Sequence, residues 1–262
     1  MKAVVFGGTG MIGRPVVACL EKAGHDVVVA TRSTGVNAQT GEGVSEVLSQ
    51  ADVLIDVTNV SSYDEAHIRQ FFSTAAENLS RAAQQQNVPH YLLLSIVGVD
   101  RIPDSPYMQA IFRQEQIIRE SGIHATILRA TQFFEFLPSF AEFFRVADTI
   151  RLPAVWNQAV ALQDVAELIA ELVAESMVRA ADQAPSVSVL DLAGPEKMRL
   201  AEMVQNIMKS SAGDRPVVED PAATYFGAQL QEDALIPLGN YRAGTTQFHD
   251  WLQQPARCSP TW

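Results

Sequence analysis

The sequence predicts an α/β fold, in which a doubly wound parallel sheet carries a smaller C-terminal lobe. Short apolar, β-prone runs alternate with helical patterns from residue 1 to about residue 130, which is typical of a parallel sheet with helices on both faces. The first run leads directly into a glycine-rich turn, and the chain becomes rich in aromatic residues after position 130. We therefore expect one domain over residues 1–130. Residues 131–262 should form mainly the lobe, with some segments that return to the sheet.

The first turn has the glycine spacing of a dinucleotide-binding loop. The β-prone residues 2–6 are followed at once by Gly7-Gly8-Thr9-Gly10-Met11-Ile12-Gly13, which has the form G-x-x-G-x-x-G. Gly7 permits a tight turn, Gly10 allows the backbone to approach a pyrophosphate, and Gly13 allows close packing of helix on sheet. Free N–H groups at the start of the next helix attract phosphate. The pattern predicts a Rossmann-type nucleotide site, the alternative being a glycine-rich loop without a ligand.

The end of the second predicted strand, residues 27–30, favours NADP over NAD. NAD-preferring folds place an acidic residue there to hold the ribose 2′-hydroxyl, whereas Asp26 lies at the opposite end of this strand. Arg32 offers a planar, permanently charged fork that suits a 2′-phosphate, with the Ser33 hydroxyl beside it. Arg14 adds a positive charge just past the glycine turn. The alternative is that Arg32 is a solvated arginine at a strand end.

Length and composition exclude several classes of protein. The 262 residues suffice for a nucleotide-binding domain with a small lobe. With 19 Lys and Arg against 30 Asp and Glu, the net charge of −11 argues against nucleic acid or a membrane surface as partner. Cys19 and Cys258 show neither a disulfide framework nor metal-ligand spacing. Without a signal-peptide pattern or a membrane-length apolar run, we expect a cytoplasmic, metal-free monomer or homodimer that takes a small-molecule substrate.

Three more strands and two helices complete the predicted sheet domain. The strands are short apolar runs bounded by polar or turn residues, and the first helix has a packed face of alanine, phenylalanine and leucine. Residues 33–43 are polar and contain glycine, so we expect at most a short strand there. The strands are expected at residues 52–57, 91–94 and 125–129, and the helices at residues 64–87 and 107–121.

The predicted lobe begins with an aromatic segment. Gln132, Phe133 and Phe134 follow the strand at residues 125–129 and therefore lie at the carboxyl edge of a parallel sheet, where ligands bind. We interpret them as lining for a nicotinamide and an apolar substrate, the alternative being that they are ordinary core residues. Further elements are expected at residues 165–175 (a helix with Asp164 as its N-cap), 187–192 (a strand) and 200–208 (a helix).

Ser95 and Tyr107 match part of a known catalytic layout. Ser95 ends a predicted strand, and Tyr107 follows twelve residues later at the start of a helix. In that layout a serine hydroxyl orients a carbonyl group, and a tyrosine exchanges a proton while hydride passes to or from nicotinamide. A lysine four residues after the tyrosine normally lowers the tyrosine pKa from about 10 toward neutrality. Ile111 stands there instead.

The missing lysine leaves two interpretations of each residue open. Tyr107 either donates a proton as a neutral phenol in the reductive direction or packs as an aromatic ring over the cofactor pocket. Ser95 either takes part in catalysis or caps a strand end. On the same helix, Glu115 and Glu120 with Arg119 predict a solvated charged face.

Several motifs along the chain belong together. They are Gly7-Gly8-Thr9-Gly10-Met11-Ile12-Gly13, Ala30-Thr31-Arg32-Ser33, Ile55-Asp56-Val57-Thr58-Asn59, Leu94-Ser95-Ile96-Val97-Gly98-Val99-Asp100-Arg101, Pro106-Tyr107, Gln114-Glu115 and Thr126-Ile127-Leu128-Arg129-Ala130-Thr131-Gln132-Phe133. This set resembles the NmrA-like, atypical short-chain dehydrogenase/reductase family of NAD(P)-binding proteins. The similarity continues through Leu192-Ala193-Gly194-Pro195-Glu196 and Tyr225-Phe226-Gly227, so it covers nearly the whole chain.

The resemblance implies an NADP site and a choice of functions. Members look like NADPH-dependent reductases of small molecules, often quinones, or like non-catalytic nucleotide sensors that bind a partner protein. We expect an NADPH-dependent oxidoreductase acting on a small aromatic, quinone-like or carbonyl compound; a sensor with a protein partner and a non-redox enzyme are the alternatives. By resemblance, Gly7, Thr9, Gly10, Met11 and Ile12 would cradle the pyrophosphate, Arg32 and Ser33 would meet the 2′-phosphate, and Thr58 would lie along the cofactor.

Overall fold

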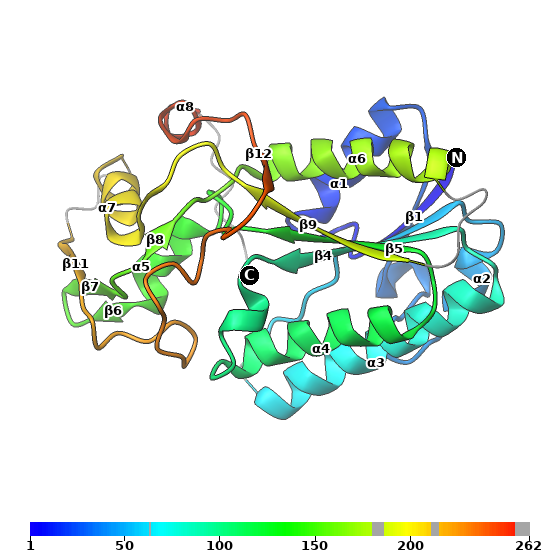
Figure 1. Ribbon diagram of the computed structural model, residues 1–262, viewed down its shortest axis with the longest axis horizontal. Helices are drawn as coiled ribbons and strands as arrows, with labels where there is room; N and C mark the ends of the chain where they lie inside the picture. Colours follow the sequence, from blue (N-terminus) through cyan, green and yellow to red (C-terminus); the bar gives the residue numbers. More distant parts are fainter. Residues whose placement is uncertain (63, 180–185, 211–214, 255–262) are drawn as a thin grey trace.

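A seven-stranded parallel sheet forms the centre of the molecule (Figure 1). The computed structural model describes residues 1–62, 64–179, 186–210 and 215–254. The strand order is β12-β9-β5-β4-β3-β1-β2, and every neighbouring pair is parallel, which confirms the predicted α/β fold. The strands are β1 (Lys2–Phe6), β2 (Asp26–Ala30), β3 (Val53–Asp56), β4 (His90–Ile96), β5 (Ala125–Ala130), β9 (Val187–Ala193) and β12 (Tyr241–Ala243).

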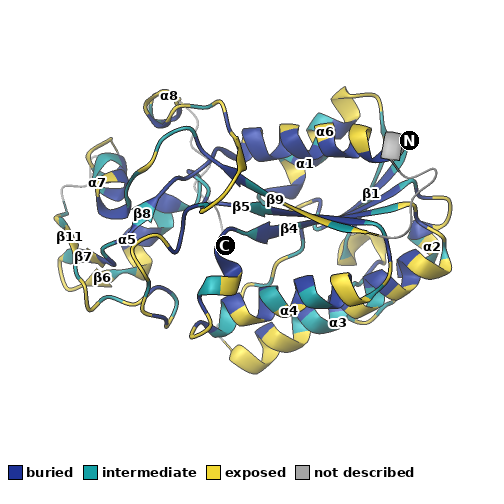
Figure 2. Cartoon of the chain, in the orientation of Figure 1, coloured by how far each residue is buried: buried dark blue, intermediate teal, exposed yellow. Residues whose placement is uncertain are grey.

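Helices cover both faces of this sheet. One layer contains α1 (Gly13–Lys22) and α6 (Leu162–Arg179), and the other contains α3 (Glu65–Gln85) and α4 (Pro106–Glu120), with α2 (Val44–Leu48) beside α3 (Figure 1). Because both faces are covered, β3 is buried along its whole length. Buried residues accordingly lie in the sheet and on the inner helix faces, and exposed residues lie on the outer faces (Figure 2).

Local capping determines where the two long helices begin. The Asp64 carboxylate accepts a hydrogen bond from the His67 backbone N–H at 2.6 Å, so α3 starts at the next residue. Ser105 caps α4, and Pro106 stands at the first helical position, where its missing N–H costs nothing. Tyr107 is therefore held in the first turn of α4.

The second half of the chain contributes to the sheet and also builds smaller sheets beyond it. β9 pairs with β5, and β12 pairs with β9 at the edge. Past the carboxyl ends of the central strands lie a two-stranded and a three-stranded sheet together with α5 and α7 (Figure 1). These elements are α5 (Phe140–Phe143), β6 (Arg145–Val146), β7 (Thr149–Leu152), β8 (Trp156–Asn157), β10 (Met198–Arg199), α7 (Leu200–Ser210) and β11 (Val217–Glu219). A short helix, α8 (Phe248–Leu252), follows β12.

One local expectation was wrong. Asp164 is not an N-cap, because α6 already begins at Leu162. Its carboxylate instead accepts hydrogen bonds from the backbone N–H and hydroxyl groups of Thr245 and Thr246, at 2.9 to 3.2 Å. The acid therefore ties the segment after β12 to the core. Residues 33–43, where at most a short strand was expected, contain no strand, and the chain makes a 3₁₀ turn, η1 (Arg32–Thr34), directly after β2.

No helix among the described residues is long and apolar enough to cross a membrane.

Candidate functional site

The glycine turn between β1 and α1 is closely packed at two of its glycines. Gly7 has a φ of +80°, and a Cβ there would lie 2.7 Å from the Val57 carbonyl oxygen. A Cβ on Gly13 would lie 2.1 Å from the Gly7 carbonyl oxygen. Side chains at these two positions would collide with backbone, so the turn and the close approach of α1 to the sheet require glycine.

Gly10 differs from these two glycines because its outer side is open. A Cβ at this position would have a single close neighbour, the Gly7 carbonyl oxygen at 3.2 Å. No side chain caps the N-terminus of α1. The Arg14 N–H donates to the Gly10 carbonyl oxygen at 3.2 Å and Pro15 has no N–H, so the first turn offers an anion chiefly the Gly13 N–H. Thr9 is exposed, Met11 is half-buried, and Ile12 has a buried side chain, so Ile12 can contribute only its backbone. This geometry fits a pyrophosphate at the predicted residues.

Arg32 and Ser33 are exposed on η1, immediately after β2. In the sheet Ala30 is the register partner of Phe6, the residue before the glycine turn, so Arg32 lies beside the start of that turn. Ser33 Oγ is 2.8 Å from the Thr31 hydroxyl. Arg14 folds back over the turn and donates from Nε to the Thr9 carbonyl oxygen at 2.9 Å. Asp26 lies at the far end of β2, as expected.

Asp56, at the end of β3, orients Thr58 and was not predicted as a site residue. Its fully buried carboxylate accepts hydrogen bonds from Thr58 N (3.0 Å) and Thr58 Oγ1 (2.7 Å). Tyr91 Oη (2.8 Å) and Gln114 Nε2 (3.0 Å) also donate to it. Burial raises the pKa of Asp56, and these hydrogen bonds oppose the rise. The sequence did contain a signal that could have identified Asp56, because it is an acidic residue within an apolar, β-prone run.

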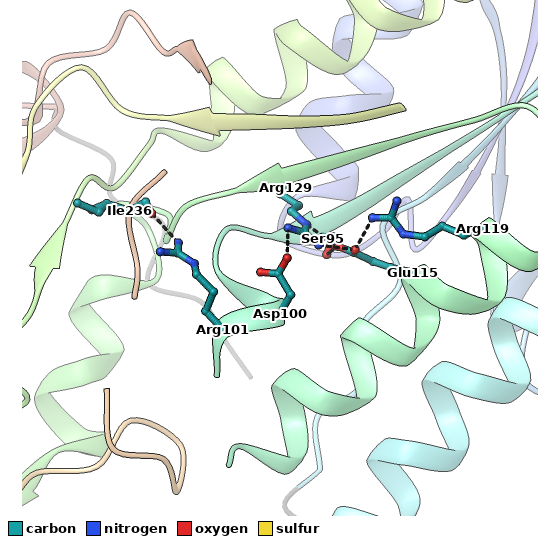
Figure 3. A network of polar contacts seen from close by, with 7 residues as sticks. All are labelled: Ser95, Asp100, Arg101, Glu115, Arg119, Arg129 and Ile236. Carbon is teal, nitrogen blue, oxygen red and sulfur yellow. Dashed lines mark hydrogen bonds and ion pairs between the residues drawn. The ribbon is translucent and has the colours of Figure 1, made fainter. Parts of the chain in front are cut away.

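Ser95 belongs to a buried charged network (Figure 3). Its hydroxyl donates to Glu115 Oε1 at 2.6 Å, and Glu115 is 0% exposed. Arg129 from β5 donates to both carboxylate oxygens of Glu115, at 2.9 and 2.7 Å, and to Asp100 at 2.8 Å. Arg119 donates to Glu115 at 3.1 Å. The prediction of a solvated face is therefore wrong for Glu115, and the Ser95 contact supports the structural interpretation of this residue over the catalytic one.

The network has a physical cause that sequence spacing does not reveal. Glu115 and Arg119 have the i, i+4 spacing of an exposed helix pair. Arg129, however, comes from the neighbouring strand, where it is the register partner of Ser95. Burial lowers the pKa of Arg129, but the hydrogen bonds and charge of Glu115 outweigh this and raise it above the usual value. A buried carboxylate is stable here because a cation and a hydroxyl satisfy it.

Tyr107 lies half-buried where β3 and α4 approach one another. Its hydroxyl donates to Asn59 Oδ1 at 3.2 Å, and Asn59 lies three residues past the end of β3. Burial raises the pKa of Tyr107 to about 12, and the Asn59 contact opposes the rise. Ile111, one turn further along α4, is 4% exposed and packs in the core. The position where a lysine was expected therefore faces apolar side chains.

The three predicted substrate residues lie in different environments in the structure. Phe134 is fully buried against Phe248 and Trp251, each with a ring centroid 5.3 Å away, so it is a core residue and we do not retain it as a substrate contact. Phe133 is half-buried and packs against the apolar core beneath α6. Gln132 is 7% exposed, and its Oε1 has no hydrogen-bond partner among the described residues.

Comparison with known proteins identifies the family. A model of the NAD(P)H-binding family matches residues 7–176, which contain the glycine turn, Arg32 and the charged network. The chain belongs to this family. The match confirms the resemblance to NmrA-like NAD(P)-binding proteins.

The relatives of this NAD(P)H-binding protein include the photosystem II assembly factor Ycf39 of Synechocystis sp., 28% identical over 149 residues. That match covers 52% of this chain and 46% of Ycf39, so the chain spans about half the length of this relative. The mitochondrial 40 kDa subunit of NADH-ubiquinone oxidoreductase from Neurospora crassa is 24% identical over 158 residues, with 51% and 41% covered.

A solved UDP-glucose-4-epimerase from Stenotrophomonas maltophila, with bound NAD, shares the fold. It is 14% identical, with a TM-score of 0.71, and the match covers 97% of this chain and 96% of the epimerase. Identity this low supports a common fold and no more.

Proposed function

We propose that this protein is an NADPH-dependent reductase of a planar aromatic acceptor, with quinone-like compounds as the substrate class. The observation that carries this proposal is a cluster of aromatic rings around Tyr107, whose hydroxyl contacts Asn59 at the carboxyl edge of the sheet. The same edge carries the glycine turn and Arg32. Ligands of open α/β sheets bind along that edge.

The aromatic rings are partly accessible. Tyr107 and Phe226 have centroids 6.3 Å apart, and Phe226 is 6.1 Å from Phe143 and 6.2 Å from Phe144. Phe143 is 40% exposed, and the other three rings are half-buried. Exposed aromatic groups that already contact one another offer edges and faces on which a flat ring can pack. We call Tyr107, Phe143, Phe144 and Phe226 the aromatic wall.

The cofactor and the residues of the chain would have separate roles in this reaction. NADPH, when bound, supplies a hydride that, together with one proton, converts a quinone to a hydroquinone and leaves NADP⁺. The turn N–H groups and Arg32 hold the phosphates, which brings the reactants together and orients them. Tyr107 can give its proton as a neutral phenol to the developing oxyanion. Such an acceptor needs less acid catalysis than a ketone, so the absence of a lysine at position 111 is compatible with turnover.

Steady-state oxidation of NADPH tests this function. We expect turnover with naphthoquinones and benzoquinones, and little or none with simple ketones. NADPH binding is measured separately by titration calorimetry. Confirmed NADPH binding without turnover across a broad quinone panel would overturn the reductase proposal.

A second candidate is a nucleotide sensor that passes the NADP⁺/NADPH ratio to a protein partner. Two observations favour it: Ile111 is in the core, and Ser95 is engaged by Glu115. The names of the relatives, an assembly factor and a subunit of a complex, are consistent with such a role. A sensor must bind the two cofactor forms with different affinity, because a ligand shifts states only by differential binding. Equal affinities for NADP⁺ and NADPH would exclude it.

A further inference from the structure

Two hydroxyl groups that could bind the oxygen of an acceptor already give their protons to carboxylates. The Ser95 hydroxyl donates to Glu115 Oε1 at 2.6 Å, and Thr58 Oγ1 donates to Asp56 Oδ1 at 2.7 Å. A hydroxyl group has one proton, so neither can donate to a ligand while these hydrogen bonds are made. Ile111 stands where a lysine would offer N–H groups. A reduction at this edge of the sheet therefore needs another donor.

Asn59 presents such a donor, because its amide oxygen is fixed by two hydrogen bonds. Oδ1 accepts from the Val60 backbone N–H at 2.8 Å and from the Tyr107 hydroxyl at 3.2 Å. A backbone N–H can only donate, so the amide atom that faces it is the oxygen. The nitrogen Nδ2 is then the other branch of the amide. Asn59 is exposed, and no described residue accepts a hydrogen bond from Nδ2.

The position of Asn59 joins the cofactor turn to the aromatic wall. A Cβ on Gly7 would lie 2.7 Å from the Val57 carbonyl oxygen and 3.1 Å from Thr58 Cα, so the chain touches the glycine turn just before Asn59. On its other side, the Asn59 amide contacts Tyr107, which belongs to the aromatic wall. The amide thus stands between the turn proposed to hold the dinucleotide and the rings proposed to hold the acceptor.

The Tyr107 ring gives Asn59 a fixed partner. It makes an edge contact with the buried Phe72 ring of α3, with centroids 5.9 Å apart, and lies 6.3 Å from Phe226 on the other strand of the chain's packing. Packing on both rings restricts the phenol, so its hydroxyl and the Val60 N–H together orient the amide before a ligand arrives. A donor that is oriented in advance stabilises developing charge better than one that must reorganise.

We propose that Asn59 is a catalytic residue of the reduction: Nδ2 donates a hydrogen bond to the carbonyl oxygen of the acceptor, and Oδ1 keeps the Tyr107 hydroxyl beside that oxygen. This role rests on the proposed function. The acceptor gains a hydride from NADPH, which leaves as NADP⁺, and negative charge develops on the carbonyl oxygen. Nδ2 stabilises this charge. One proton, passed on by Tyr107 and replaced from water, completes the hydroquinone.

The variant Asn59→Asp tests the donor by itself. Aspartate keeps an oxygen that can accept from Val60 and Tyr107, but it has no N–H group. We expect kcat for menadione, a naphthoquinone, to fall about ten- to hundredfold. The melting temperature should hold, and the KM for NADPH should change much less than kcat. The matched control Asn240→Asp adds the same charge at an exposed position just before β12 and should keep the natural rate.

An infrared spectrum reports the hydrogen bond without turnover. Menadione with isotope-labelled carbonyl carbons is bound to protein saturated with NADP⁺, and the isotope difference spectrum isolates its carbonyl bands. A donated hydrogen bond weakens the C=O bond, so one band should lie at lower frequency in the natural protein than in Asn59→Asp. Tyr107→Phe removes the phenol proton and leaves the amide held by Val60, so it should keep the lower-frequency band.

The outcomes separate this assignment from the proposed function. A band that is lost in Tyr107→Phe and kept in Asn59→Asp would show that Tyr107 binds the oxygen, which overturns the assignment. Equal rates and equal spectra for the natural protein and Asn59→Asp would also overturn it and leave the reductase function intact. If the bands differ but no quinone is reduced, the reductase proposal fails and Asn59 remains the group that binds the carbonyl oxygen. If menadione neither binds nor is reduced, both fail.

Discussion

Arg32 is an exposed cation just past the end of β2, and we propose that its role is to bind a phosphate of the cofactor. In the described structure it makes no ion pair, whereas Arg129, Arg199 and Arg242 each pair with carboxylates. An exposed arginine without a structural partner contributes little to folding. Its planar guanidinium group suits a phosphate. NADPH carries a 2′-phosphate that NADH lacks, so this arginine would favour NADPH.

Arg32→Ala should therefore affect the two cofactors differently. We expect NADPH affinity to fall ten- to a hundredfold, because charge-assisted hydrogen bonds contribute about 1.5–3 kcal/mol, and NADH affinity to change little. Titration calorimetry with both cofactors measures this. The control Arg69→Ala, on the exposed face of α3, should leave both affinities unchanged. Equal losses for NADPH and NADH would contradict the assignment.

Tyr107 should remain protonated throughout the neutral range, since burial raises its pKa to about 12. A proton donor with that pKa is fully protonated at every pH below about 10. Any contribution of Tyr107 to quinone reduction should therefore be constant between pH 6 and 10. The pH profile of kcat/KM for natural protein and for Tyr107→Phe measures it. A Tyr107-dependent rate change near pH 7 would show that another group lowers this pKa.

Ile111→Lys should destabilise the protein rather than restore a catalytic triad. The side chain is 4% exposed and surrounded by apolar groups, so an ammonium there lacks a partner. We expect a loss of about 3 kcal/mol in the free energy of unfolding, measured with urea. Ile111→Met, which conserves volume, should cost less than about 1.5 kcal/mol. A stable lysine variant with increased ketone reduction would reverse this view of the position.

At the scale of elements, the β1–turn–α1 unit combines two separate requirements. Gly13 lets α1 approach the turn, and Gly10 leaves space on the outer side. The close approach at Gly13 is a requirement of folding, whereas the open space at Gly10 is a requirement of the proposed dinucleotide binding. Substitutions at the two glycines should therefore have different consequences.

Gly10→Ala should abolish dinucleotide binding and leave the melting temperature nearly unchanged, because its Cβ meets one atom at 3.2 Å and otherwise enters open space. Gly13→Ala should reduce both binding and stability, the latter by about 2 kcal/mol, since its Cβ would lie 2.1 Å from a carbonyl oxygen. Thermal unfolding and cofactor titration of both variants provide the comparison. Normal NADPH binding by Gly10→Ala would show that the pyrophosphate does not bind at this turn.

For the whole molecule, buried polar contacts join segments that are far apart in the chain. Glu115 connects α4 with β4 and β5 through Ser95 and Arg129. Arg101 donates to the carbonyl oxygen of Ile236 at 2.7 Å (Figure 3). It also donates to the carbonyl oxygen of Asp233 at 3.1 Å, so the C-terminal segment is fastened to the segment after β4. These contacts hold the helix of Tyr107 and the segments after residue 130 around one edge of the sheet.

Arg129→Met should cost about 3–5 kcal/mol in the free energy of unfolding, because it leaves the Glu115 charge buried without its main partner. The double variant Glu115→Met with Arg129→Met should lose less than the sum of the single losses. Urea denaturation measures all three. The exposed pair Arg242–Glu171 is the control, and Arg242→Met should cost less than about 1 kcal/mol. Additive losses at the buried pair would show that the two residues act independently.

Local patterns in the sequence determined the α/β class, most strand and helix positions, the glycine turn and the position of Arg32. Each depends on neighbours within a few residues: apolar periodicity, turn chemistry, or a residue at a strand end. The burial of Glu115, the role of Asp56 and the contact of Arg101 with Ile236 were decided by the tertiary structure. Their partners come from other elements, up to 135 positions away in the numbering. A charged or amide side chain is solvated or buried according to the residues that folding places against it. The spacing of residues along one helix or strand cannot predict a partner that comes from another element.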